Sequence, residues 1–137
     1  MTMHLITRVM NDGKEMVLED WHTHGFTVPA GFITDGASVP QAFWSILPPY
    51  KRTKKAAVLH DYLTKIAKNK AERLAADKIF KRLLGEAGIG PIRRQLAYMA
   101  VRLGAVFGAG EGRLEDSMGK EYRKKKLEKN WNRNPRP

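Results

Sequence analysis

A three-residue link between two helical segments constrains this fold more than any other feature of the sequence. Apolar side chains at helical spacing predict a helix over 54–67, with Thr53 as its N-cap. A second helix is predicted over 71–84, ending at Gly85. Because only residues 68–70 separate the two helices, they must lie antiparallel as a hairpin.

This hairpin is expected to bring His60 opposite Asp77. The two residues are equally distant from the middle of the link, so they lie at the same height on paired helices. Asp77 shares an apolar stripe with Leu74 and Phe80, and a carboxylate on such a stripe is costly unless it is paired. A hydrogen bond from His60 would fix the imidazole tautomer and leave its other nitrogen to act as a base toward water. The alternative is a buried pair that clamps the two helices and does no chemistry.

A polar loop and a second carboxylate suggest a cation site. Asp61 lies about a quarter-turn from His60 and could bind a hard cation through oxygen, together with Asp35 and loop carbonyl groups. Calcium suits such oxygen ligands. The predicted binding loop consists of Thr34, Asp35, Gly36 and Ser38.

Zinc is the other cation to consider. If residues 21–25 form a strand, His22 and His24 project to the same face. With His60 and an aspartate they would make a site of nitrogen and oxygen ligands. Surface histidines without a metal are the alternative interpretation.

The first third of the chain is typical of strands. Asp12-Gly13 predicts a hairpin turn, and turn-forming residues recur through the loop at 35–40. A third helix is predicted to begin at Pro91 and to run toward Phe107. The fold class is therefore α+β, a small N-terminal antiparallel sheet followed by a helical hairpin and a third helix. The predicted strands span 5–10, 15–21, 25–29 and 31–34.

Charge divides the chain into a domain and a tail. The formal net charge is +11, and the last 21 residues carry eight basic and two acidic side chains. We expect a single α+β domain over 1–112 and a basic tail over 113–137, which would contact an acidic neighbouring protein, nucleic acid or an anionic membrane. The expected tail contacts are Arg123, Lys124, Lys125, Lys126 and Trp131.

Composition also excludes several classes of protein. With 42% hydrophobic residues the chain can form a modest core, and without cysteine it has no disulfide, thiolate metal site or thiol nucleophile. No apolar run approaches the length of a membrane span, and the first residues lack the pattern of a signal peptide. We therefore expect a protein that is soluble when made.

Three blocks of sequence resemble a widespread domain of unknown function found in tailed bacteriophages and prophages. They read GFITDGASVP at 31–40, AAVLHDYL at 56–63 and ADKIF at 76–80. The resemblance covers about residues 26–107 and implies a phage-encoded product associated with the virion or tail, present in the host cytoplasm before assembly. It does not supply a reaction.

A second resemblance is to the secreted calcium-dependent phospholipases, in which a His-Asp helix pairs with an antiparallel helix that carries an Asp. It implies His60 as the base for water, Asp61 as a calcium ligand and Asp77 as the group that orients His60. This chain lacks the cysteines that flank those motifs, and Thr64 stands where a tyrosine is usual.

Two functional hypotheses follow. In the first, the protein is a phage hydrolase that cleaves a phospholipid ester or a peptidoglycan bond of the cell envelope, to aid host entry or lysis. In the second, it is a non-catalytic tail component in which the His-Asp site holds the fold together and the basic tail docks on neighbouring subunits. A nucleic-acid-binding accessory protein, binding through the tail, is a third reading.

Overall fold

The computed structural model describes residues 4–34, 50–106 and 114–120. They belong to two compact units, one of residues 4–34 with 114–120 and one of residues 50–106. Antiparallel strands build the first unit and three helices build the second, so the predicted α+β class is confirmed. Within the described part, none of the helices combines the length and the apolar character that a membrane crossing requires.

A three-stranded antiparallel sheet organises the first unit, in the order β1–β2–β5. The predicted Asp-Gly turn joins its first two strands. Gly13 has a φ of +85°, which glycine adopts without steric cost, and the Lys14 N–H donates to the Asp12 carboxylate at 3.0 Å. The strands are β1 (Thr7–Val9), β2 (Glu15–Val17) and β5 (Ile33–Thr34).

A separate two-stranded hairpin pairs β3 (Trp21–Thr23) with β4 (Phe26–Val28). The prediction of one strand over 15–21 was wrong, because β2 and β3 belong to different sheets. The turn consists of His24 and Gly25, with φ values of +48° and +79°. Two positive φ values in a two-residue hairpin loop are those of a type I′ turn.

Residues 114–120 belong to the strand unit. They contain the short 3₁₀ helix η2 (Leu114–Ser117), after which Met118 forms an isolated antiparallel bridge with Phe32. The Gly119 N–H donates to the Gly31 carbonyl at 2.8 Å. Ordered contacts with the sheet therefore extend to Gly119, inside the range that the sequence assigned to the tail.

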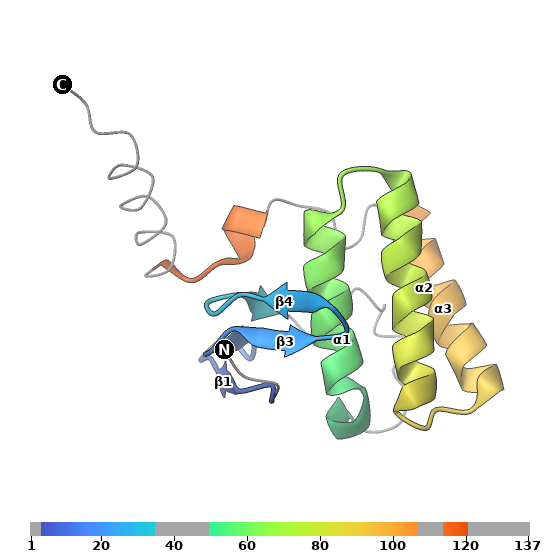
Figure 1. The fold of residues 1–137 in the computed structure, drawn as a ribbon, viewed down its shortest axis with the longest axis horizontal. Coiled ribbons are helices and arrows are strands. Elements are labelled where there is room, and N and C mark those ends of the chain that lie inside the picture. Colours follow the sequence, from blue (N-terminus) through green and yellow to red (C-terminus); the bar gives the residue numbers. More distant parts are fainter. Residues whose placement is uncertain (1–3, 35–49, 107–113, 121–137) are drawn as a thin grey trace. The chain divides into compact units, whose positions relative to one another are not determined.

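Three helices form the second unit: α1 (Tyr50–Ile66), α2 (Lys70–Glu86) and α3 (Pro91–Val106). They run antiparallel in succession, and α2 contacts both of the others (Figure 1). Thr53 was wrongly predicted as an N-cap, since it lies inside α1 and is buried. The predicted end of the second helix at Gly85 was also wrong, since α2 continues to Glu86.

The start of α2 is capped from both directions. Asn69 is the N-cap residue, and its side-chain oxygen accepts the Glu72 N–H at 2.9 Å. Glu72 reaches back to accept the Lys68 N–H at 2.9 Å. These reciprocal bonds satisfy main-chain donors that a helix start otherwise leaves unpaired, and they fix the tight turn between α1 and α2.

Small side chains bring α3 close to α2. The face of α3 that is buried consists of Ala97, Ala100, Val101 and Gly104, and across the interface Lys81 Nζ donates to Gln95 at 2.6 Å. In the helical unit the buried apolar side chains of α1 and α2 are Ala56, Ala57, Val58, Leu59, Leu63, Ala76, Phe80, Leu83 and Leu84. The strand unit has its own buried side chains, Val17, Trp21, Val28 and Phe32.

Candidate functional site

His60 on α1 and Asp77 on α2 face each other across the helical hairpin. His60 Nε2 and Asp77 Oδ1 are 2.6 Å apart, and both side chains are 0% exposed. The capped three-residue link explains this register, because it holds equally distant positions of the two helices at the same height. The contact is therefore a short, fully buried hydrogen bond to a carboxylate.

Two arginines complete the surroundings of the Asp77 carboxylate. Arg73, one turn earlier on α2, donates from Nε to Oδ1 at 3.2 Å. Arg102 on α3 donates from Nη1 to Oδ2 at 2.6 Å. Sequence reasoning missed both residues. Arg73 had a signal, since it lies four residues before Asp77 on the same helix, whereas nothing local pointed to Arg102.

These donors keep Asp77 ionised. Burial raises the pKa of the Asp77 carboxyl. The hydrogen bond and charge interaction with His60, the charge of Arg73 and the hydrogen bond from Arg102 all lower this pKa, and together they outweigh the effect of burial. The net effect lowers the pKa below its ordinary value. An ionised carboxylate only accepts, so His60 Nε2 carries the proton of the bond between them.

The remaining nitrogen of His60 is buried without a partner. Among the described residues, none offers a hydrogen-bonding group within reach of His60 Nδ1. The imidazole also packs on Phe80, with ring centroids 4.7 Å apart and an interplanar angle of 37°. Because Nε2 donates to Asp77, Nδ1 is the ring nitrogen left without a hydrogen bond, in an orientation fixed by Asp77 and Phe80.

The structure describes only some of the other residues that were predicted for this site. Asp61 is buried, and its main-chain carbonyl accepts the Thr64 hydroxyl at 2.8 Å. Thr34 is buried at the end of β5 in the strand unit. The rest of the predicted loop and tail sites lies outside the described residues, namely Asp35, Gly36, Ser38, Arg123, Lys124, Lys125, Lys126 and Trp131.

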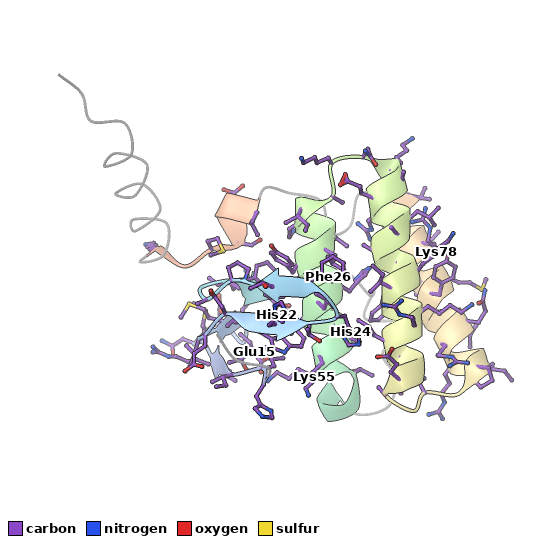
Figure 2. The ribbon with its side chains drawn as sticks, in the orientation of Figure 1. Glu15, His22, His24, Phe26, Lys55 and Lys78 are labelled. Carbon is purple, nitrogen blue, oxygen red and sulfur yellow. The ribbon has the colours of Figure 1, made fainter. Side chains whose placement is uncertain are left out.

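His22 and His24 lie on the β3–β4 hairpin, where both side chains are exposed (Figure 2). His24 belongs to the turn and not to a strand that continues from His22, so the alternation behind the zinc prediction does not apply. His22 Nδ1 bonds the Thr27 hydroxyl at 2.8 Å, and His24 Nδ1 bonds the Thr23 hydroxyl at 2.7 Å. The described residues contain no cluster of three His, Asp or Glu side chains that could surround a metal ion.

Comparison with known families matches residues 13–101 to the family described as "Protein of unknown function (DUF1353)". This stretch contains His60, Arg73 and Asp77, while Arg102 follows it by one residue. No curated protein and no solved structure matches the chain.

Proposed function

We propose that this chain, which belongs to the DUF1353 family of proteins of unknown function, is a hydrolase whose base is His60. The observation that carries the proposal is the buried Nδ1 without a partner, on an imidazole whose Nε2 is bonded to Asp77. A buried nitrogen without a hydrogen bond costs about 1–3 kcal/mol, so its presence calls for a role that offsets the cost.

The proposed reaction is hydrolysis of a bacterial envelope bond, a phospholipid ester or a peptidoglycan linkage. A water held at His60 Nδ1 attacks the carbonyl carbon of the phospholipid ester, or of an amide in the peptidoglycan, and its proton passes to Nδ1 as the new carbon–oxygen bond forms. The bond to the leaving group then breaks, and that group takes the proton from Nδ1. The Asp77 carboxylate balances the positive charge that the imidazole carries between the two steps.

Replacing His60 with glutamine tests this role sharply. The glutamine amide can still donate to Asp77, so the His60→Gln variant keeps the contact between helices and loses the base. His22→Gln is the matched control, because it makes the same change at an exposed histidine of the strand unit. Each protein would be assayed on phosphatidylglycerol vesicles and on purified peptidoglycan, with calcium, zinc or EDTA, since Asp61 and Asp35 are the predicted cation ligands.

We expect turnover by the wild type and by His22→Gln, and turnover at least about 100-fold lower by His60→Gln. Equal turnover by all three proteins would remove His60 from the mechanism. If the wild type cleaves neither substrate under any of the three conditions, the hydrolase proposal fails.

Complete burial of His60 and Asp77 favours a second candidate, a non-catalytic tail component in which the pair joins two helices. In this case His60→Ala destabilises the protein by about 3 kcal/mol, because a hydrogen bond to a charged group is lost and a cavity forms. His60→Gln then costs clearly less, since the donor to Asp77 remains. Urea titrations followed by helical circular dichroism measure both free energies of unfolding.

For either candidate we propose a bacteriophage gene product that is associated with the virion or tail. The resemblance of three sequence blocks to a phage and prophage domain supports this origin, and the basic C-terminal residues suit docking on acidic neighbours. Immunoblotting of density-gradient-purified particles tests the association, and absence of the protein from the particles would contradict it. A truncation after Lys120 tests whether the tail is needed for this association, while it retains the bonds of Met118 and Gly119 to the sheet.

A further inference from the structure

The helical unit has a cavity of about 560 Å³ at the end of the helical bundle where α1 stops, α2 starts and α3 stops. It lies beside the Asp77 cluster, which consists of Asp77, His60, Arg73 and Arg102, since the two arginines form part of its lining. The cavity wall also includes Thr64 and residues of the link between α1 and α2. Neither proposed role of His60 uses this space.

Positive charge dominates the described lining of the cavity. Four cationic side chains contribute to it, and no acidic side chain does. The nearest acidic groups on α2 are already engaged, Asp77 with the two arginines and Glu72 with the Lys68 main chain. Counting both carboxylates against the four cations still leaves two positive charges, which attract an anion. The cations are Lys68, Lys70, Arg73 and Arg102.

Arg102 gives the cavity a fixed donor. Asp77 accepts its Nη1 at 2.6 Å and so holds the planar guanidinium in place, while 32% of the side chain remains exposed. A guanidinium has five N–H donors, so the bond to Asp77 leaves others for a bound oxyanion. Lys68 and Lys70 are exposed, and in the described part of the chain no carboxylate pairs with either ammonium group.

We propose that this cavity binds a phosphate group. An oriented guanidinium with flexible ammonium groups beside it matches the charge and the many acceptors of a phosphate. The volume exceeds that of the anion itself, so the phosphate can carry a small organic substituent such as a lipid headgroup. The proposal does not rest on the N-terminus of α2, whose Glu72 N–H is occupied by Asn69, and it is independent of the hydrolase proposal.

The test uses the full-length chain and two double variants of equal charge. Lys68→Gln with Lys70→Gln removes the ammonium groups of the cavity and leaves the Asp77 cluster intact. Lys55→Gln with Lys78→Gln is the control, because both lysines are exposed on the helical unit, outside the described lining (Figure 2). The basic C-terminal residues are the same in all three proteins, so their nonspecific attraction for anions cancels in the comparison.

Binding of inorganic phosphate to each protein is measured by calorimetric titration. Binding of each protein to phosphatidylglycerol vesicles is compared with its binding to phosphatidylcholine vesicles. The expected result is at least about tenfold weaker binding of one phosphate probe by the cavity variant, with the control within about twofold of the wild type. A loss with inorganic phosphate identifies a small anion as the ligand source, and a loss only with phosphatidylglycerol identifies a lipid headgroup. Equal weakening of both variants, or no binding by the wild type, would overturn the proposal.

Discussion

Asp77→Asn is the substitution that most directly tests the electrostatics of the helical unit. The asparagine keeps the shape of the side chain, but it removes the charge that faces His60, Arg73 and Arg102 and can present N–H groups to their donors. Arg73 is largely buried, so its guanidinium would lose the counter-charge that Asp77 supplies, although its Nη2 still donates to the Val101 carbonyl. We therefore expect a large loss of stability from a change of very few atoms.

The size of this loss follows from the three contacts. The buried bond from His60 to a charged acceptor contributes about 1.5–3 kcal/mol. The bond from Arg102 is also short, but a third of that side chain is exposed, so solvent screening reduces its contribution to about 1 kcal/mol or less. Arg73 also loses the carboxylate that accepts from its Nε, which adds to the cost. Together these effects predict a loss of about 3–5 kcal/mol, a large share of the roughly 5–15 kcal/mol that stabilises a typical domain.

The pH dependence of the loss separates charge from packing. Because the pKa of Asp77 is lowered in the folded protein, its ionised form stabilises the fold above the unfolded pKa of about 3.9. That stability disappears as the pH falls through the unfolded pKa toward the lower folded pKa. The difference between wild type and Asp77→Asn should therefore be full at pH 6–7 and should shrink in acid below about pH 4.

Urea titrations at pH 7, 5 and 3, followed by helical circular dichroism, measure this difference. Asp116→Asn is the control, because it neutralises an exposed carboxylate and should change the free energy of unfolding by less than about 0.5 kcal/mol. A cost for Asp77→Asn below about 1 kcal/mol at pH 7 would refute the assignment of a buried ion cluster. A cost that stays constant down to pH 3 would show that lost packing, and not lost charge, accounts for it.

Further predictions concern the ends of α2. Asn69→Ala removes the acceptor of the Glu72 N–H and should lower the free energy of unfolding by about 1 kcal/mol in a urea titration. Gly88→Ala should lower the free energy of unfolding by about 1–2 kcal/mol, because Gly88 has a φ of +87°. Gly90→Ala should be nearly neutral, because the new methyl group meets no atom within 4 Å. Equal effects of the two glycine substitutions would contradict the assigned backbone conformation.

The part of the site that depends on local geometry could be predicted from the sequence. A link of three residues leaves two helices little choice but to pair antiparallel, and this fixes which positions share a height. For this reason the contact between His60 and Asp77 could be read from residue numbers alone. Arg102 could not, because it lies on a third helix after a longer connection, whose length does not determine the rotation of α3 about its axis.

The packing of α3 shows a second limit of pattern reading. Its large apolar residues recur at helical spacing, yet Ile92, Met99 and Leu103 are at least 49% exposed. The face that packs is made of small residues such as Ala97, Ala100 and Gly104, which let the two helix backbones approach closely. Hydrophobic spacing identifies a helix, but which of its faces is buried depends on the shape of the partner.

The β3–β4 turn could not be predicted for a different reason. Asp12-Gly13 carries a recognised turn pattern, and the hairpin around it was expected. In the second hairpin a histidine occupies the first position with a φ of +48°, a conformation that a residue with a Cβ adopts only rarely. The paired strands and Gly25 impose this conformation on His24, so it depends on tertiary context and has no local signal.

Asp77 connects the two proposed sites of the helical unit through opposite oxygens. Its Oδ1 accepts from His60, and its Oδ2 accepts from Arg102, which lines the cationic cavity. A phosphate in that cavity would attract the same guanidinium that helps to neutralise Asp77, while Arg73 stays bonded to the carboxylate. Ligand binding would thus draw charge away from one oxygen of Asp77 and strengthen its attraction for the His60 proton. The cavity and the imidazole are therefore coupled through a single carboxylate, whether the pair acts as a base or as a structural link.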